Sequence, residues 1–563
     1  MLGKQYYFTI IGIVLALITV LVGFHHVVVA EEVMVFSDSG PEAVETEFAN
    51  CRYGAVPLSS DQFAKIGELG AGWILNFGVN SSVPVTSNNA QYVPIIRIRE
   101  ERPNGQYNGV WYLNFDTGLT GVAAEAYVKS RVAALPAGML WLVGNEIERL
   151  YQDNITPATY ADAYHDIYHW IKEVDPSAQV AISGLVEVTP LRLVYLDMIW
   201  EAYLDQFGMS MPVDVWNMHL YPIPEVQADG VTPGAASIPE GVDLMQTTAV
   251  PKQASDGNSA LCSQSNVYCY AEHDDMAVFA EQVTMMRQWM KEKGQQQKPL
   301  IISEFSILWL YVDSTGDGQP DYLRDEYGLL FTPQRVASFM QQAFDYLENT
   351  KDPNLGYALD DNRLVQQWMW YALHAPWRDL DDDGVRDYGN WEAAPSGNSS
   401  DLYWPINPPG DMTLQRTLIG DTFRNHVSAI APTQNLVIDR VDSLAYARPV
   451  TVPTTITATL QVLFRNVGNT AVSTPFAVSF YDQNDALIGS VDMTDLVGGC
   501  GVYPYTVSLD WPIDINDMNS QVIPFTVRVD SGGVISEVSE ADNVAEGFVI
   551  INANNLFLPT VHK

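Results

Sequence analysis

Positive charge is scarce in this 563-residue sequence, which has 29 Lys and Arg against 68 Asp and Glu and a formal net charge of -39. No cluster of basic residues occurs along it. Because nucleic acids and anionic lipid headgroups are bound mainly through Lys and Arg, the composition disfavours both as partners. The sequence therefore predicts a partner that is neutral or that carries cations.

Cysteine is equally rare. The four cysteines, Cys51, Cys262, Cys269 and Cys500, are too few for a disulfide scaffold and lack the C-x-x-C spacing of a metal site. Cys262 and Cys269 lie in one polar stretch, which favours a local disulfide if the chain is exported. Cys51 and Cys500 fall in different predicted domains, and we expect them to be free and buried rather than paired.

An apolar run covers residues 6–24, after Lys4, and the small residues Val28, Val29 and Ala30 follow it. This pattern predicts a signal peptide over residues 1–30, and therefore a secreted or cell-surface protein. Because the run is also long enough to span a bilayer, an uncleaved N-terminal membrane anchor remains open.

Short apolar runs alternate with amphipathic helical stretches from about residue 48, which is typical of a parallel sheet with crossover helices. Eight such units predict an α/β fold, a (β/α)8 TIM barrel, in a domain of residues 31–432. The expected strands are residues 52–56, 73–77, 92–98, 140–145, 180–185, 213–221, 300–305 and 364–372. The expected helices are residues 60–69, 123–134, 157–174, 190–207, 274–293, 333–348 and 412–430.

Two of these strands end in a glutamate. Trp-Leu-Val-Gly-Asn-Glu closes the fourth strand at Glu146, and Leu-Ile-Ile-Ser-Glu-Phe brings Glu304 to the end of the seventh. Because the carboxyl ends of barrel strands share one face, we expect both carboxylates to converge there. Two converging carboxylates are the minimum apparatus for cleaving a glycosidic bond.

The ordered set Gly144-Asn145-Glu146, His219-x-Tyr221 and Ser303-Glu304-Phe305 resembles the signature of clan A glycoside hydrolases. The resemblance covers roughly residues 48–430. It implies a retaining glycoside hydrolase that cleaves O-glycosidic bonds of a poly- or oligosaccharide by double displacement, with no cofactor required for catalysis. In that clan the first glutamate is the general acid/base and the second the nucleophile, roles that here pass to Glu146 and Glu304.

The resemblance also implies substrate contacts. Asn145 would hydrogen-bond the sugar 2-hydroxyl, Tyr221 would donate to Glu304, and His219 lies on the same strand face as Tyr221. Trp370, at the end of the eighth strand, is our candidate for an aromatic platform under a sugar ring. Core packing remains open for these side chains.

Arg97 and Arg99, near the end of the third strand, are candidates for orienting a carboxylate or a substrate hydroxyl. The clan usually draws such an arginine from an earlier strand, so the sequence departs from the pattern here. The alternative function is a non-catalytic cell-surface protein that binds glycan or mediates adhesion through a degenerate barrel. Such a protein has no reason to keep two glutamates at reaction distance.

A calcium-like spacing occurs at Asp379, Asp381, Asp383 and Asp387, with Gly384 at the sixth position of the loop. It predicts a structural Ca2+, although an acidic solvated turn remains open. Residues 313–321 show a weaker version of the same pattern. His165 and His169 are spaced for zinc on one helix, but no third ligand is evident and we expect no zinc there.

After about residue 433, β-branched alternation replaces helical periodicity, as in Ile-Thr-Ala-Thr-Leu-Gln-Val over residues 456–462. This predicts an all-β Ig-like sandwich over residues 433–553, followed by a tail of residues 554–563. Residues 534–543 resemble the end of the bacterial CARDB (cell-adhesion-related) domain. That resemblance implies an accessory module, separable from the barrel and suited to cell-surface attachment.

Overall fold

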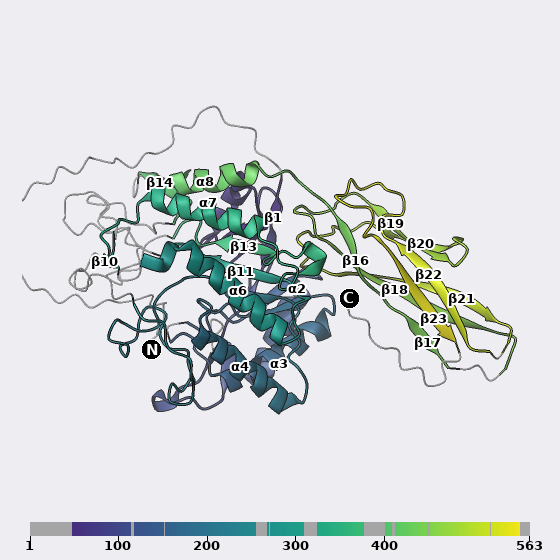
Figure 1. Ribbon diagram of the computed structural model, residues 1–563, viewed down its shortest axis with the longest axis horizontal. Helices are drawn as coiled ribbons and strands as arrows, with labels where there is room; N and C mark the ends of the chain where they lie inside the picture. Colours follow the sequence, from purple (N-terminus) through teal and green to yellow (C-terminus); the bar gives the residue numbers. More distant parts are fainter. Residues whose placement is uncertain are drawn as a thin grey trace, which may run out of the picture.

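The computed structural model describes residues 48–113, 118–150, 152–254, 267–268, 271–308, 324–375, 400–407, 411–447, 451–517 and 519–551. They form two regions, which we call the α/β region (residues 48–430) and the β region (residues 433–551). In Figure 1 the helices of the α/β region surround its strands, and the β region extends away from one end. Within the described part of the chain, every helix is too short or too polar to cross a membrane.

Parallel strands fill the interior of the α/β region. A six-stranded sheet has the order β3-β2-β1-β13-β11-β9, and a three-stranded sheet has the order β4-β7-β8. The strands are β1 (Asn50–Ala55), β2 (Ala71–Leu75), β3 (Gln91–Val93), β4 (Ile95–Ile96), β7 (Leu140–Val143), β8 (Gln179–Ile182), β9 (Trp216–His219), β11 (Leu300–Phe305) and β13 (Gln367–Trp370).

The two sheets are linked at both edges. Pro94, which has no N–H to offer a ladder, separates β3 from β4 within one extended segment. At the other edge Ala181 and Val215 form an isolated parallel bridge between β8 and the residue before β9. The parallel strands therefore follow one another in the cyclic order that the sequence predicts, as a curled sheet.

Helices lie outside these strands: α1 (Ile66–Leu69), α2 (Gly121–Ala134), α3 (Pro157–Val174), α4 (Pro190–Phe207), α6 (Met276–Glu292), α7 (Pro333–Asn349) and α8 (Leu418–Ser428). Thr189 and Thr332 cap α4 and α7 by accepting the N–H of Arg192 and Arg335, and proline follows each threonine. The expected closing helix, residues 412–430, starts later than predicted. Its first residues form β15 (Asp411–Arg416), which pairs in a hairpin with β14 (Tyr403–Asn407).

Short elements complete the α/β region: η1 (Ser60–Lys65), β5 (Ile98–Glu100), η2 (Pro103–Gly105), β6 (Trp111–Leu113), β10 (Val267–Tyr268), η3 (Ala271–Asp274), β12 (Arg324–Asp325) and η4 (Ala358–Asp360). Alternate residues of the parallel strands face two different cores. One core, which includes Ile302 and Trp368, packs against the helices. The other, which includes Leu142 and Ile301, lies between the strands.

The β region consists of two sheets packed face to face. One has the order β16-β18-β21, and the other has the order β17-β23-β22-β19-β20. Phe464, Phe480 and Phe525, from β18, β19 and β22, belong to one shared core. The strands are β16 (Leu436–Val441), β17 (Leu444–Tyr446), β18 (Thr454–Asn466), β19 (Phe476–Asp482), β20 (Leu487–Met493), β21 (Tyr505–Ile515), β22 (Gln521–Arg528) and β23 (Val544–Ile551).

The two regions are joined covalently at the start of β1. Cys51 and Cys500 form a disulfide, so the prediction that both are free is wrong. Their 449-residue separation hid the pairing, because nothing in the sequence brings the two segments together. Beside the disulfide, the Cys51 N–H donates to the carbonyl of Asn469 (3.0 Å) and Arg52 donates to that of Val467 (3.2 Å).

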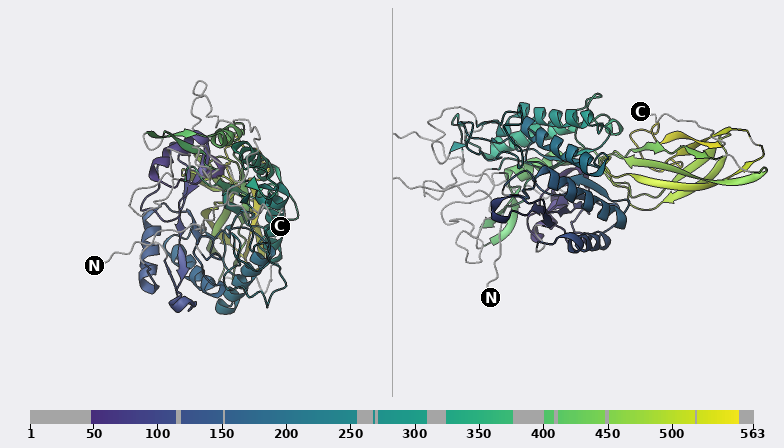
Figure 2. Two further views of the ribbon diagram at one scale, coloured as in Figure 1. Left: turned by 90° about the vertical axis from the view of Figure 1, so that its left-hand side faces the viewer. Right: turned by 90° about the horizontal axis from the view of Figure 1, so that it is seen from below.

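The β region also supplies part of the core of the α/β region. Val502 and Tyr503, from the loop before β21, pack with Trp73, Leu142 and Ile301 between the parallel strands. Cys51 lies at the N-terminal end of its strand, so this loop closes the N-terminal end of the strand layer. In Figures 1 and 2 the β region extends from that end, and Figure 1 shows β10 and β14 at the opposite end.

Candidate active site

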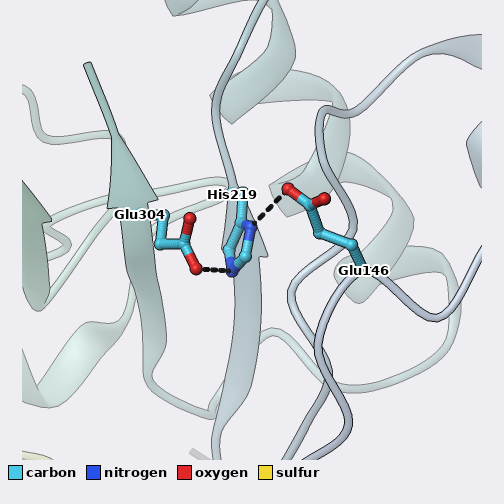
Figure 3. A group of neighbouring side chains, drawn as sticks. All are labelled: Glu146, His219 and Glu304. Atoms are coloured by element: carbon cyan, nitrogen blue, oxygen red, sulfur yellow. Dashed lines mark hydrogen bonds and ion pairs between the residues drawn. The ribbon is translucent and has the colours of Figure 1, made fainter. Parts of the chain in front are cut away.

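Three side chains meet at the C-terminal end of the parallel strands. Glu146 follows β7, His219 ends β9, and Glu304 lies in β11 (Figure 3). His219 Nδ1 is 3.1 Å from Glu146 Oε1, and His219 Nε2 is 3.5 Å from Glu304 Oε1. One ligand atom from each side chain lies within 4.8 Å of the other two. The structure therefore brings together the glutamates and the histidine that the strand ends predicted.

An irregularity in β11 aims Glu304 toward this site. Ile302 packs on the helix side, so simple alternation would return Glu304 to the helices two residues later. The register shifts after Ile302 in the pairing of β11 with both β9 and β13. Phe305 takes the place in the helix-side core, and the Glu304 carboxylate reaches His219.

Backbone shape positions the other two members. Gly144 and Glu146 have φ of 89° and 44°, so the chain turns sharply as it leaves β7. That conformation is costly for a residue with a side chain, and it is common at functional sites. Gly184 makes room for the histidine, since a Cβ there would lie 2.2 Å from His219 Cδ2.

The geometry does not suit a metal ion held by these three side chains. An imidazole binds a given ion through one nitrogen only. Here the two carboxylates face different nitrogens of the His219 ring, as Figure 3 shows, so an ion at one nitrogen would have the other glutamate across the ring. The arrangement suits the sharing of protons between two carboxyl groups.

The two glutamates have different charges in this resting arrangement. Burial works to raise the pKa of Glu146, but Arg149 and His219 outweigh it and lower that pKa to about 2. Burial raises the pKa of Glu304 to about 7, with the Glu146 charge adding to it and His219 and Tyr221 opposing it. Burial lowers the pKa of His219, but the two glutamates reverse this and leave it raised. The resting site therefore favours an ionised Glu146 and a protonated Glu304.

Arg149 is a site residue that the sequence analysis missed. Its Nη1 lies 2.5 Å from Glu146 Oε2, and its Nη2 donates to the carbonyl of Ala235 (2.9 Å). The only sequence signal was the spacing of three between Glu146 and Arg149, which matters only if the intervening turn is helical or tight.

The contact of Tyr221 with Glu304 is present, and the sugar contact of Asn145 stays a prediction. The Tyr221 hydroxyl donates to Glu304 Oε2 (3.2 Å). Asn145 is buried, and its Oδ1 has no hydrogen-bond partner among the described residues. A buried amide oxygen without a partner is uncommon, and a sugar hydroxyl would supply the missing donor.

Trp370 does not line the site. Its side chain is 0% exposed, its Nε1 donates to the carbonyl of Ser400, and its ring packs against Phe305 and Phe339 in the helix-side core. Trp368 and Trp370 do share one strand face, but that face points away from the site, so the choice of Trp370 as a platform is wrong. The next residue, Tyr371, is half-buried and close enough for the Glu304 and Glu146 charges to raise its pKa, although burial contributes most.

Arg97 orients a carboxylate, but not a catalytic one. Its Nε donates to Asp153 Oδ1 (2.6 Å), and Asp153 Oδ2 accepts the backbone N–H groups of Asn145 (2.9 Å) and Ile98 (3.1 Å). Arg97 therefore fixes the turn that carries Asn145. Its charge also opposes the rise in the pKa of Glu304.

A second buried charge cluster lies beside the site. Arg192, fully buried in α4, pairs with Glu148 (3.2 Å), Glu187 (3.8 Å) and Glu225. Its Nη2 donates to the carbonyls of Ala236 (2.9 Å) and Ser237 (3.3 Å). No local pattern marks this cluster in the sequence, because its members come from three separate segments: Glu148, Glu187 with Arg192, and Glu225. It anchors the segment after β9 to the end of the strand layer.

Several predictions fall outside the described residues. They are the calcium loop with Asp379, Asp381, Asp383 and Asp387, the weaker loop of residues 313–321, the Cys262 to Cys269 disulfide, the apolar run of residues 6–24, and the tail. The histidine pair is described: His165 stacks on Phe207 with ring centroids 3.6 Å apart, and its Nδ1 contacts the Tyr203 hydroxyl (2.8 Å). This is packing between α3 and α4.

No family model and no curated protein matches the chain. Among solved structures, it is similar to a GH128 subgroup I endo-β-1,3-glucanase from Amycolatopsis mediterranei, solved with laminaritriose, at 12% identity and a TM-score of 0.34 over 67% of this chain and 99% of that one. A GH128 subgroup II endo-β-1,3-glucanase from Sorangium cellulosum gives 14% and 0.33 over 66% and 98%. The CARDB domain of a Pyrococcus furiosus protein, solved with two metal ions, gives 18% and 0.16 over 21% and 93%. These likenesses are coarse, and the function proposed below rests on the site itself.

Proposed function

We propose that the chain is a retaining glycoside hydrolase that cleaves O-glycosidic bonds of a poly- or oligosaccharide with Glu146 and Glu304. The observation that carries the proposal is the spacing of these two glutamates, which are both buried and have carboxylate oxygens within 4.8 Å of one another. Retaining enzymes hold their carboxyl groups about 5 to 5.5 Å apart, whereas inverting enzymes leave room for a water between them. A non-catalytic glycan-binding protein would not need this spacing.

The reaction takes two steps. In the first, one carboxyl protonates the departing glycosidic oxygen while the other, ionised, attacks the anomeric carbon and forms a glycosyl ester. In the second, the first residue takes a proton from water, and the water oxygen displaces the ester. The Tyr221 hydroxyl holds Glu304 in position in both steps, and Asn145 binds the sugar 2-hydroxyl. Tyr371 replaces Trp370 as our candidate aromatic contact for the sugar.

The assignment of Glu146 as acid/base and Glu304 as nucleophile comes from the clan A resemblance. The resting charges run the other way, because Arg149 keeps Glu146 ionised and burial keeps Glu304 protonated. Both descriptions place one proton on the pair, as the chemistry requires. They differ in which residue gives it up first.

Azide rescue tests both the function and the roles. The purified protein is first screened on β-1,3-glucan, β-1,4-glucan, mannan, xylan and galactan, and then on an aryl glycoside of the sugar that it cleaves. Glu146→Ala should retain much of its activity on the aryl glycoside and gain turnover with azide, giving a glycosyl azide of retained configuration. If azide rescued only Glu304→Ala, Glu304 would be the acid/base and Glu146 the nucleophile. No hydrolysis on any substrate would leave glycan binding as the function.

The finer structural predictions also stay proposals. The cyclic order of the parallel strands supports a (β/α)8 barrel, and the two-sheet packing supports an Ig-like accessory module. We further propose export directed by residues 1–30, which N-terminal sequencing of the mature protein would test. Calcium binding by Asp379, Asp381 and Asp383 predicts that the melting temperature falls on chelation and recovers with Ca2+.

A further inference from the structure

Arg149 is held between two fixed partners. Its backbone N–H donates to the carbonyl of Glu146 (3.0 Å), which closes the turn after β7 and turns the guanidinium back toward the same residue's carboxylate. Nη1 lies 2.5 Å from Glu146 Oε2, while Nη2 donates to Ala235 O (2.9 Å). The side chain is 12% exposed, so little solvent competes for either contact.

The Ala235 carbonyl is itself held in place. Gly234 N–H donates to the carbonyl of Glu225 (2.8 Å), and Ala236 N–H donates to that of Pro224 (2.9 Å). These two stretches of backbone touch so closely that a Cβ on Gly234 would lie 2.3 Å from Pro224 O. These contacts fix the position of the Ala235 carbonyl, which accepts from Arg149 and keeps the guanidinium directed at Glu146.

We propose that Arg149 is a positioning residue that holds Glu146 as a carboxylate in the free enzyme, and so prepares Glu146 for the base step of the reaction at the expense of the acid step. The inference rests on the proposed function. It gives Arg149 no contact with the sugar.

The two steps of the reaction place opposite demands on Glu146. When the glycosidic C–O bond breaks, Glu146 must lose a proton that the neighbouring cation discourages it from holding. When water attacks the glycosyl ester of Glu304, Glu146 must take up the water proton, and the ion pair keeps it ready as a carboxylate. Removing the cation should therefore speed the first step at high pH more than the second, because Glu146 stays ionised at that pH and the second step gains no carboxylate. The glycosyl-enzyme should then accumulate.

Other charged and titratable groups also face Glu146. Glu148 lies on the same turn, His219 and Tyr221 come from β9 and the residues after it, Glu304 comes from β11, and Tyr371 follows β13. The Glu148 and Glu304 carboxylates oppose ionisation of Glu146, and His219 favours it. All of them remain in an Arg149 variant, so any change in Glu146 reports the loss of the guanidinium.

The test compares Arg149→Met with Arg149→Lys, which keeps the positive charge. Arg131→Met is the matched control, because Arg131 packs over the Tyr127 ring on α2, away from the site. Protein labelled with ¹³C at the glutamate carboxyls is titrated by NMR, with Glu146→Gln identifying the signal of Glu146. In Arg149→Met the midpoint of Glu146 should rise by about one to two pH units. It should move little in Arg149→Lys and not at all in Arg131→Met.

A purely structural role would lower the melting temperature of Arg149→Met without moving the Glu146 midpoint, and that result would overturn the inference. If Arg149→Met fails to fold, the wild-type titration still decides, because a Glu146 midpoint at or above the ordinary glutamate value would refute the ion pair's effect. On the aryl glycoside, Arg149→Met should show a burst of released phenol and an alkaline limit moved to higher pH. Absence of hydrolysis by the wild type would refute the proposed function. The NMR titration would still decide whether Arg149 holds Glu146 as a carboxylate.

Discussion

Two buried sets of polar groups at opposite ends of the parallel strands differ in their hydrogen bonding: Arg52 with Asp360 at the N-terminal end, and Glu304 with Asn145 at the C-terminal end. At the N-terminal end, Arg52 donates to both oxygens of Asp360 (2.9 and 2.8 Å) and to the carbonyls of Gln366 and Val467. At the C-terminal end, Glu304 Oε1 and Asn145 Oδ1 lack a hydrogen-bond partner among the described residues.

This difference separates stability from chemistry. The hydrogen bonds of Arg52 at the N-terminal end, together with the disulfide, hold the β region against the strand layer. Incomplete ones at the C-terminal end cost stability, and they leave polar atoms ready for a ligand. The same carboxylate-to-amide substitution should therefore have opposite consequences at the two ends.

The largest expected effect is on turnover in Glu304→Gln. The amide cannot form the glycosyl ester, so turnover should fall by roughly 10⁴-fold or more while folding is kept. The measurement is kcat on the best substrate of the glycan panel, with the melting temperature alongside. A Glu304→Gln enzyme with wild-type turnover would refute the assignment.

Asp360→Asn is the matched control at the N-terminal end. It should keep kcat but destabilise the fold by about 3 kcal/mol or more, because breaking this buried ion pair leaves Arg52 with only the more distant Glu348, at 3.9 Å. A loss of turnover in folded Asp360→Asn would mean that the two ends of the parallel strands are coupled. Stability and chemistry would then not be separated between them.

The sequence predicts much of this architecture where the signals are local. The bounds of α3 and α4 match residues 157–174 and 190–207, which helical periodicity predicts, and the convergence of Glu146 with Glu304 follows from parallel strands. The face of Trp370 could not be predicted, because β13 is buried on both sides and carries no polar alternation. Contacts of Arg149 with Ala235 join segments that only the folded chain brings together.

Truncation after residue 432 should have the next largest effect. This prediction revises the expectation that the two domains are separable. The truncated chain loses the disulfide and uncovers the core residues that pack with Val502 and Tyr503. Loss of a native disulfide alone typically costs about 2–5 kcal/mol, so we expect aggregation or unfolding. Expression of residues 31–432, judged by size-exclusion chromatography and circular dichroism, is the measurement. A soluble, active fragment would show that the β region is accessory.

The disulfide alone should have a smaller effect. Cys51→Ala with Cys500→Ala should lower the free energy of unfolding by about 2–4 kcal/mol, since the bond closes a very long loop. Turnover of the folded protein should not change, because the bond lies at the end opposite the glutamates. Denaturant unfolding measures the first quantity and kcat the second. Cys262→Ser with Cys269→Ser is the control, because the disulfide predicted there would close a short loop and contribute much less.

The smallest expected effect is a pH-dependent gain of stability in Glu304→Gln. The pKa of Glu304 is raised to about 7 in the folded protein, against an ordinary value of 4.5. Below pH 4.5 the group is protonated in both the folded and unfolded states, so its burial carries no ionisation cost. As the pH rises, the unfolded state ionises first and wild-type stability falls, until the loss is complete above the folded pKa.

The amide introduced by Glu304→Gln has no charge to lose, so the melting temperature of this variant minus that of the wild type should increase between pH 4.5 and about 7 and then level off. The gain should be roughly 1–4 °C, measured by differential scanning calorimetry across that range. Burial also raises the pKa of Glu187 to about 7, but Glu187 is present in both proteins and cancels in the difference. A difference that stays constant with pH would mean that Glu304 is ionised in the folded protein. Its burial with incomplete hydrogen bonds would then carry no ionisation cost.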